Sequence, residues 1–355
     1  MSLPPKPHRD YIQEIRPLLP ADLLTPKSSK LWALAAHTLL VVAGILTIRV
    51  APSPWLWPLV SVLMGHSMGC LGLIIHDVGH NSVIRRQPFK YLLELFVWGL
   101  VMMSPHLWHR IHNQSHHRAP NTLRDPDRRY LKSESTAATR WYDRAFVPSN
   151  GSGRFNLTFL AFFAYISRNM FAAMAFRGDR KPAIATYKPE YSARDTVRIF
   201  LEVGSAVAIH IGIFFAAGAT LGQYLWAGLL PAFGGSILLS AYTVTNHLLN
   251  PLVCEPVDPL EATTSVQVPR FLDFLHHNFS HHTEHHLFPH VSSDHYPLVR
   301  RILLEKYPER YNCLPYGEAL RRLWKSDAFM ELPEDSMSIQ GTASGRARAT
   351  IISIE

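Results

Sequence analysis

The sequence predicts an all-α integral membrane protein with four transmembrane helices in two hairpins, interfacial helices and a cytoplasmic histidine-rich cap. Three observations lead to this prediction. The 355 residues are 47% hydrophobic but only 17% charged, whereas soluble domains carry roughly 25% charged residues. The apolar residues gather in long runs that the basic residues avoid. Histidine is unusually frequent, with 20 residues grouped outside most of these runs.

Four apolar stretches are long enough to cross a bilayer. Three of them contain no charged residue and the other contains only Glu202; they are Leu31–Ile48, Trp55–Ile75, Ile199–Ala217 and Leu221–Asn246. At 1.5 Å per residue, each can cross a hydrocarbon core of about 30 Å. The links at 49–54 and 218–220 are short, so consecutive spans must be antiparallel neighbours. The four spans therefore form two hairpins.

The basic residues predict the orientation. Of the 35 Lys and Arg residues, only Arg49 lies in a span or a hairpin tip. All others precede residue 31, lie between 76 and 198 or follow 246, which places them on one side of the membrane. Basic residues favour the cytoplasmic side, so we expect a multi-pass inner-membrane protein with both termini in the cytoplasm. This topological distribution argues against a nucleic-acid-binding surface.

The domain organisation follows from these spans. We expect a cytoplasmic N-terminal segment at 1–30, and membrane hairpins with an intervening cytoplasmic region at 31–246. A cytoplasmic cap at 247–331 and a flexible tail at 332–355, rich in small polar residues, complete the chain. Two further apolar stretches, Tyr91–Met103 and Phe155–Phe176, are interpreted as interfacial or re-entrant helices. The first is too short to span, and Arg168 interrupts the second.

Histidines recur in patterned clusters beside the spans. His76 and His80 follow the second span, and a second cluster lies about 30 residues later. A third cluster follows the fourth span, and His247 lies at the end of that span. The second cluster contains His112, His116 and His117, and the third contains His282, His285 and His286. A pair at i, i+4 puts two imidazoles on one helical face. Because all clusters lie on one side of the membrane, a helical bundle can bring them together.

These imidazoles are too numerous for one ion and fit a pair of ions. Imidazole suits Zn, Cu, Fe and Ni, so the residues alone leave the metal open. The three scattered cysteines exclude a Cys-rich zinc or iron–sulfur site. Carboxylates that could hold the rings in one tautomer are Asp77, Asp125, Asp127, Asp273 and Glu284. We interpret His37, His66 and His210, inside the spans, as packing or hydrogen-bonded groups.

The segments HDVGH, HNQSHH and HTEHHLFPH resemble the three histidine boxes of the membrane fatty acid desaturase family. The order of hairpin, two boxes, hairpin and third box is similar too, over about residues 30–330. The resemblance implies two non-haem iron ions with O2 as co-substrate, and as ligands it implies His76, His80, His112, His116, His117, His247, His282, His285 and His286. The second box is one residue longer than the family's common HxxHH pattern, so His109 is an alternative to His112.

The resemblance also implies the chemistry. We expect O2-dependent oxidation of an unactivated C–H bond in a fatty acid or fatty acyl chain, giving an alkene. The opening stretch PPKPHRDYIQEIRPLLPADLL and the compact size resemble bacterial members of the family. Among these, the chain is similar overall to desaturase-like enzymes that decarboxylate medium-chain free fatty acids to 1-alkenes. Desaturation and decarboxylation both remain open. The alternatives are a fatty acid or carotenoid hydroxylase, a divalent metal transporter and a zinc-dependent membrane hydrolase.

Two partners are expected besides the lipid bilayer. The chain has no Gly-rich dinucleotide fingerprint, so the resemblance implies an external ferredoxin- or cytochrome-type electron donor with its reductase. The basic face suits an acidic donor. The acyl chain needs an apolar tunnel, and its polar head needs a cation or a donor. The basic residues near the expected entrance, which lipid headgroups could equally engage, are Arg85, Arg86, Arg128 and Arg168.

Overall fold

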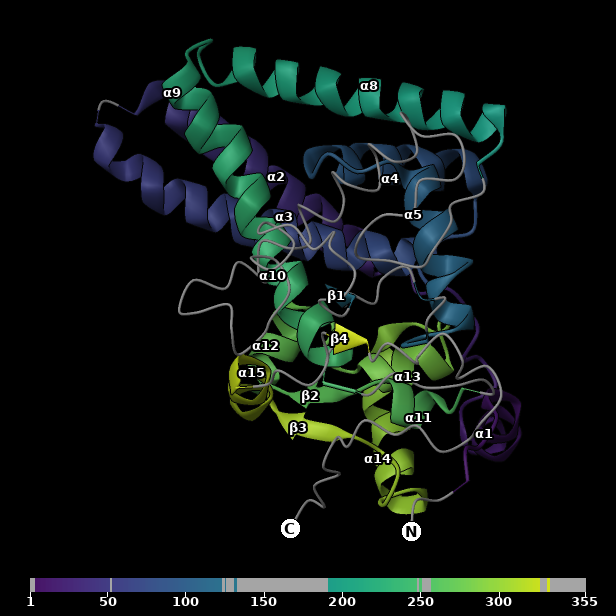
Figure 1. The fold of residues 1–355 in the computed structure, drawn as a ribbon. Helices are drawn as coiled ribbons and strands as arrows, with labels where there is room; N and C mark the ends of the chain where they lie inside the picture. Colours follow the sequence, from purple (N-terminus) through teal and green to yellow (C-terminus); the bar gives the residue numbers. More distant parts are fainter. Residues whose placement is uncertain are drawn as a thin grey trace.

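The computed structural model describes residues 4–51, 53–122, 125, 131–132, 191–247, 249–250, 257–325 and 331–332. Helices dominate this part of the chain, and the long helices lie to one side of a smaller group of short elements (Figure 1). The stretch Phe155–Phe176, the side chains of Asp127, Arg128 and Arg168, and the tail after Leu332 lie outside the described residues.

The four predicted spans are confirmed as four long apolar helices. They are α2 (Lys30–Val50), α3 (Trp57–Gly79) with a preceding 3-10 turn at Pro54–Leu56, α8 (Ala193–Ala216), and a continuous helical run at Leu221–His247. That run comprises α9 (Leu221–Tyr224), a π-turn (Leu225–Leu229) and α10 (Leu230–His247). Figure 1 shows α8 along the top and α10 running from α9 down toward the short elements.

Helix α8 begins six residues before the predicted span. Ser192 and Asp195 form a capping box, in which Asp195 N donates to Ser192 Oγ at 3.1 Å and Ser192 N donates to Asp195 Oδ2 at 2.9 Å. These bonds satisfy amide donors that a helix N-terminus leaves unpaired. The helix therefore starts at a polar signal that precedes its apolar stretch, and the predicted start at Ile199 is too late.

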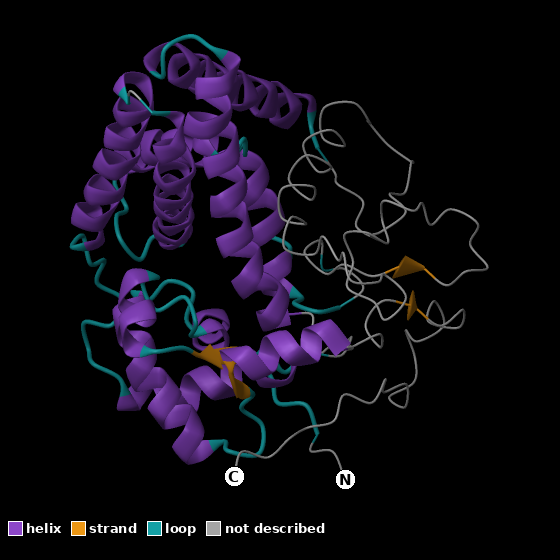
Figure 2. Ribbon diagram, turned by 90° about the vertical axis from the view of Figure 1, so that its left-hand side faces the viewer, coloured by secondary structure: helices purple, strands orange, loops and turns teal. Residues whose placement is uncertain are grey.

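Helices α3 and α10 pack with very close backbones. A Cβ atom on Gly65 would lie 3.2 Å from Gly234 Cα, and one on Gly235 would lie 2.9 Å from Gly69 N. Small residues allow this approach between membrane helices. Figure 2 shows the long helices side by side above the short elements. This contact fixes the ends of α3 and α10, which carry His76 and His247, relative to each other.

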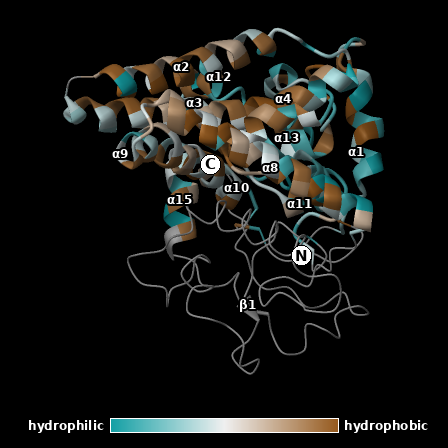
Figure 3. Cartoon of the chain, turned by 90° about the horizontal axis from the view of Figure 1, so that it is seen from above, coloured by the Kyte–Doolittle hydropathy of each residue, from teal (hydrophilic) through white to brown (hydrophobic). Residues whose placement is uncertain are grey.

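The apolar stretch predicted at Tyr91–Met103 forms α4 (Gln87–Leu100). It packs between α3 and α8, with Trp98 buried and Leu92 61% exposed. Similar apolar exposure continues along the spans, where Leu39 is 67% and Leu201 69% exposed. Figure 3 shows the apolar colour dominating α2, α3 and α4, whereas α1 is largely hydrophilic. Such continuous apolar surface is expected where helices face lipid.

The short elements form what we call the cap, the part that packs at one end of the spans. Its helices are α1 (His8–Ile15), α11 (Pro259–Ala262), α12 (Arg270–Leu275), α13 (His282–Leu287), α14 (Tyr296–Lys306) and α15 (Tyr316–Lys325). Strands β2 (Ser265–Gln267) and β3 (Cys313–Pro315) pair in parallel, with Ser265 opposite Cys313. A second short pair joins β1 (Leu131–Lys132) to β4 (Glu331–Leu332), also in parallel.

The N-terminal segment is an integral part of the cap. Tyr11 and Ile15 of α1 are fully buried in one apolar cluster with Phe288 and Val299. The His8 Nε2 atom lies 2.9 Å from Leu287 O, at the end of α13. The predicted all-α membrane fold is thus confirmed, with two small two-stranded sheets added in the described residues.

Candidate metal centre

The nine predicted histidines converge in two groups. Helix α3 ends in the first box (His76–His80), and a short irregular segment carries the second box (His112–His117). Helix α13 carries the third box (His282–His286), and His247 ends α10. The first group comprises His76, His80, His112, His117 and His285, and the second comprises His116, His247, His282 and His286. Within each group the ligand atoms lie within 4.8 Å of one another.

In the first group the ring nitrogens face a common centre. His112 Nε2 lies 3.0 Å from His76 Nε2 and 3.2 Å from His117 Nε2. His285 Nε2 lies 3.1 Å from His117 Nε2. The buried His80 Nε2 has no hydrogen-bonding partner among the described residues, although its ring packs against His117 and His285 with centroids 4.7 Å away. A bound ion would supply the partner that this nitrogen lacks.

The second group is equally compact and lies directly beside the first. His282 Nε2 is 2.5 Å from His247 Nε2 and 3.1 Å from His286 Nε2. The ring of His116 packs 4.5 Å from that of His247. His117, which belongs to the first group, stacks on His286 of the second at 4.5 Å. The two centres therefore share the second and third boxes.

Local structure explains which group each histidine of the first and third boxes joins. His76 and His80 are one helical turn apart, and α3 ends as Asn81 adopts a left-handed φ of 62°. In α13, His282 and His286 are also one turn apart and both join the second group. His285, on a different side of α13, joins the first group.

Asp125 and Asn121 connect the second box to α10. Asp125 Oδ1 lies 2.8 Å from His116 Nδ1, and Asp125 Oδ2 accepts a bond from Asn121 N at 2.7 Å. Asn121, at a left-handed φ of 56°, donates its Nδ2 to His247 O at 3.0 Å. The predicted ring-holding role of Asp125 thus has a direct geometric basis, because a carboxylate at Nδ1 leaves the Nε2 lone pair for a metal.

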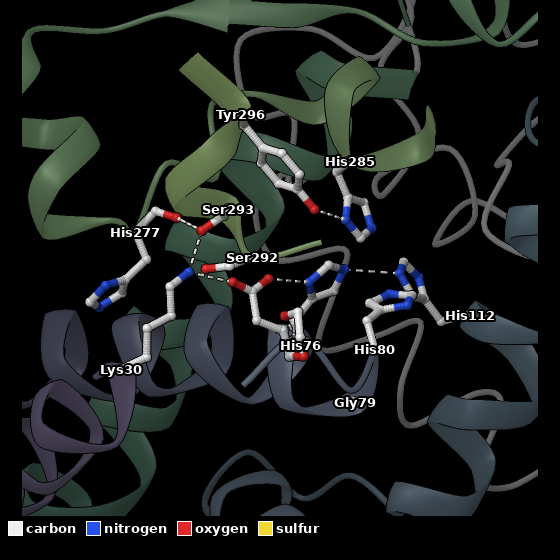
Figure 4. A network of polar contacts seen from close by, with 12 residues as sticks. Lys30, His76, Gly79, His80, His112, His277, His285, Ser292, Ser293 and Tyr296 are labelled. Carbon is white, nitrogen blue, oxygen red and sulfur yellow. Dashed lines mark hydrogen bonds and ion pairs between the residues drawn. The ribbon is translucent and has the colours of Figure 1, made fainter. Parts of the chain in front are cut away.

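A buried carboxylate and a buried tyrosine hydroxyl lie next to the Nδ1 atoms of two rings of the first group (Figure 4). Asp77 Oδ1 lies 3.4 Å from His76 Nδ1, and Asp77 Oδ2 accepts a 2.5 Å bond from Lys30 Nζ. Lys30 also donates to the Ser293 hydroxyl. The Tyr296 hydroxyl lies 3.0 Å from His285 Nδ1. The sequence interpretation missed Lys30 and Tyr296, although Tyr296 lies in a conspicuous segment shortly after the third box.

Glu284 and Asp273, two of the carboxylates predicted to hold the rings, bond to other side chains. Glu284, fully buried in α13, accepts bonds from Arg300 Nε at 2.9 Å and from Tyr311 Oη at 2.5 Å. Burial opposes ionisation of Glu284, but the positive charge of Arg300 brings its net pKa below the ordinary value. Asp273 accepts a bond from Ser280 Oγ at 2.5 Å. Glu284 therefore braces α13 within the cap instead of holding a ring.

His109 lies outside both groups. Its Nε2 is 2.9 Å from Glu94 Oε1, and its Nδ1 is 2.9 Å from Asn113 Nδ2. Residues His109–Asn113 form a π-turn, and this turn brings His112, one turn later, to the first group. Of the two second-box alternatives, the geometry brings His112 to the other rings.

Electrostatics favours neutral imidazoles in both groups. Burial, followed by the charges of the neighbouring imidazoles, holds the pKa values of His80, His117, His285 and His286 well below the ordinary 6.5. A neutral imidazole has the lone pair that metal binding requires. Two nitrogens about 2.1 Å from one ion lie about 3.0–3.4 Å apart, close to most of the separations above. The residues therefore fit two imidazole-bound transition-metal ions.

Comparisons with known proteins agree with this geometry. The family model of fatty acid desaturases matches residues 52–317, which include all three boxes. An sn-1 oleoyl-lipid 12-desaturase of Picosynechococcus sp. is 24% identical over 290 residues, covering 78% of this chain and 77% of that protein. An enzyme with the same name from Synechocystis sp. is 24% identical over 329 residues, covering 86% and 85%. The chain is therefore a membrane oxidoreductase that belongs to the fatty acid desaturase family.

Proposed function

We propose that this enzyme uses O2 to oxidise an unactivated C–H bond in a fatty acyl chain, giving an alkene, at two non-haem iron ions. The observation that carries the proposal is the convergence of nine imidazoles in two adjoining groups. The first group would hold one ion with His76, His80, His112, His117 and His285. The second would hold the other with His116, His247, His282 and His286.

The iron ions would supply the oxidising power by activating dioxygen, which acid–base groups cannot replace because an alkyl C–H bond has no acidic proton. The protein keeps the rings neutral and dry: His80 and His282 are each 2% exposed. Asp77, Asp125 and Tyr296 orient rings through their Nδ1 atoms. This support fixes the ring planes before any substrate binds.

The electron balance requires an external donor. Removing two hydrogen atoms from adjacent carbons releases two electrons and two protons. Two further electrons and two further protons are needed to reduce O2 to two water molecules. We propose a ferredoxin- or cytochrome-type donor with its reductase, docking on the basic side of an inner-membrane enzyme whose termini are cytoplasmic.

Two products have the same electron balance. The printed names of the relatives describe desaturation of a lipid-bound oleoyl chain, which supports an internal double bond here. The N-terminal segment resembles that of bacterial members of the family, which include enzymes that decarboxylate free fatty acids. There, loss of a hydrogen atom from the β-carbon, followed by one-electron oxidation of the radical and loss of CO2, would give a terminal alkene. In this structure that segment includes α1, whose His8 Nε2 lies 2.9 Å from Leu287 O at the end of the third-box helix.

Product analysis tests the proposal. The iron-loaded protein in liposomes, with a reduced ferredoxin system and O2, receives saturated free acids and acyl lipids of graded length. Internal unsaturation at unchanged chain length would establish desaturation, and a 1-alkene one carbon shorter would establish decarboxylation. A hydroxylated chain would replace the alkene proposal by hydroxylation. Turnover without O2, or metal uptake into the vesicles without lipid oxidation, would contradict the proposed function.

A further inference from the structure

A third group of metal-binding side chains lies apart from the two histidine groups. His66 and Cys70 come from α3 and His276 follows α12, and their ligand atoms lie within 4.8 Å of one another. His66 precedes His76 by ten residues on the same helix, which corresponds to about 15 Å along its axis. None of these three residues belongs to either iron group of the proposed function, so the cluster is a separate place in the molecule.

The separations match the edges of a metal tetrahedron. His66 Nε2 lies 3.2 Å from His276 Nε2, and Cys70 Sγ lies 3.8 Å from both ring nitrogens of His66. A tetrahedral Zn²⁺ has nitrogen ligands at about 2.1 Å and a sulfur ligand at about 2.3 Å. Two such nitrogens lie about 3.4 Å apart, and a nitrogen and a sulfur about 3.6 Å apart. Shifts of a few tenths of an ångström would complete the geometry.

The surrounding residues hold these ligands in place. The Tyr242 hydroxyl of α10 lies 2.7 Å from His276 Nδ1. Its oxygen can accept a hydrogen bond from Nδ1–H, which leaves the lone pair on Nε2. The next two residues, His277 and Asn278, have left-handed φ values of 54° and 59° and turn the chain away from the cluster. Cys70 and His276 are both buried.

Two further atoms bear on metal binding. The Cys70 thiol donates to Leu275 O at 3.5 Å, so its hydrogen points toward the end of α12. The ring of His37 on α2 is tilted relative to the His66 ring, with centroids 6.5 Å apart, and the buried His37 Nδ1 has no partner among the described residues. On metal binding, a metal–sulfur bond replaces the S–H bond and the proton leaves to solvent. Because its Nδ1 has no partner among the described residues, His37 could become a fourth ligand after a side-chain movement.

We propose that His66, Cys70 and His276 bind one thiophilic divalent ion, best matched by Zn²⁺. One thiolate with two imidazoles suits zinc and disfavours calcium and magnesium, which prefer oxygen ligands. The ion would join α3, which carries the first box, to the end of α12, six residues before the third box. Its role is structural: it fastens the cap to the membrane helix on which the iron groups are built.

Metal counting tests this site directly. The purified, untagged protein, loaded with iron and then with zinc, is analysed by inductively coupled plasma mass spectrometry. The wild-type protein should hold one zinc in addition to two irons. Cys70→Ser and His276→Ala should lose that zinc and keep both irons. The controls Cys313→Ser, at a second buried cysteine, and His210→Ala, at a buried span histidine bonded to Tyr224 and Leu100, should keep the zinc.

Spectroscopy on the wild-type protein keeps the test informative where a variant fails to fold. Co²⁺ at this site should show a thiolate-to-cobalt charge-transfer band, and zinc X-ray absorption should show one sulfur and at least two nitrogen neighbours. Zinc with nitrogen neighbours only, lost in His285→Ala and kept in Cys70→Ser, would overturn the proposal by placing zinc in the iron groups. Wild-type protein that takes up no zinc would overturn it as well. Neither result depends on iron-supported lipid oxidation.

Discussion

Lys30 Nζ, at the start of the first span, lies 2.5 Å from Asp77 Oδ2, near the end of the second span. Both side chains are about 95% buried, and the other oxygen of Asp77 faces His76 Nδ1 at 3.4 Å. Lys30 lies where α2 meets the cap, and Asp77 contacts a ring of the first histidine group. The ion pair therefore links these two places. Its geometry makes Lys30 a positioning residue for His76, acting through Asp77.

Lys30→Met should weaken iron binding without touching a ligand. The substitution leaves Asp77 as a buried charge without its cation, which typically costs about 3–5 kcal/mol. Loss of support behind a ligating histidine typically weakens metal binding about 10–100-fold. Iron titration and thermal unfolding measure the two effects. The exposed Lys306→Met serves as control, and Lys30→Met with Asp77→Asn should recover part of the stability. Unchanged iron affinity in Lys30→Met would contradict the assignment.

Tyr296→Phe should act on the first group alone. The variant keeps the buried aromatic ring and removes the hydroxyl that lies 3.0 Å from His285 Nδ1. We expect about 10–100-fold weaker binding of one iron, because His285 loses the contact that orients it. Iron binding isotherms with two separable sites provide the measurement. Tyr307→Phe, which removes a cap hydroxyl bonded to Glu14, is the matched control. Equal weakening by both variants would show a general effect on the cap.

Gly235→Ala should separate α10 from α3. A Cβ at this position would lie 2.9 Å from Gly69 N and 3.2 Å from the Met68 carbonyl carbon, so backbone atoms must move. Overpacking of this kind costs about 1–3 kcal/mol. Gly212→Ala is the control, because a Cβ there meets no atom within 4 Å; replacing a helical glycine should stabilise that helix slightly. Unfolding temperatures in detergent compare the variants, and equal stability of Gly235→Ala and wild type would refute the close contact.

Acid should destabilise the metal-free enzyme. The pKa values of His80, His117 and His285 lie below 6.5 because these rings are buried among other imidazoles. Below pH 6.5 the unfolded chain binds protons that the folded chain excludes, so the free energy of unfolding falls as pH falls. Each such histidine contributes up to about 1.4 kcal/mol per pH unit.

Thermal unfolding of metal-free protein at pH 7.5, 6.5 and 5.5 provides the measurement. The unfolding temperature should change little between the first two values and fall between the last two. The fall should be smaller in His285→Ala, which lacks one of the titrating rings. A rise in unfolding temperature at pH 5.5 would contradict neutral rings in the folded protein.

Features that depend on local sequence were predictable. Long uncharged runs identified the spans, and histidines one helical turn apart identified the boxes, because both signals lie within single elements. The start of α8 was missed because a polar capping box, not hydropathy, sets it. The two short parallel pairs could not be anticipated, because they join segments far apart in the chain, such as Ser265 and Cys313.

Contacts between residues far apart in the chain account for the other differences between the sequence predictions and the structure. Lys30 and Asp77 are 47 residues apart, and Asn121 reaches His247 O over 126 residues; no spacing rule relates such pairs. Glu284, expected behind a ring, pairs instead with Arg300, 16 residues later in the chain. His66, expected as a packing or hydrogen-bonded group, meets His276 only through the fold.

The central claim is that two adjoining histidine groups each hold one iron. Counting iron in purified wild-type, His285→Ala and His286→Ala enzyme tests it most directly, since the two variants each remove a ring from a different group. The wild type should contain two irons per chain, and each variant should retain about one, with lipid oxidation abolished in both. A wild type saturated at one iron, or variants that keep both irons and full turnover, would contradict the claim.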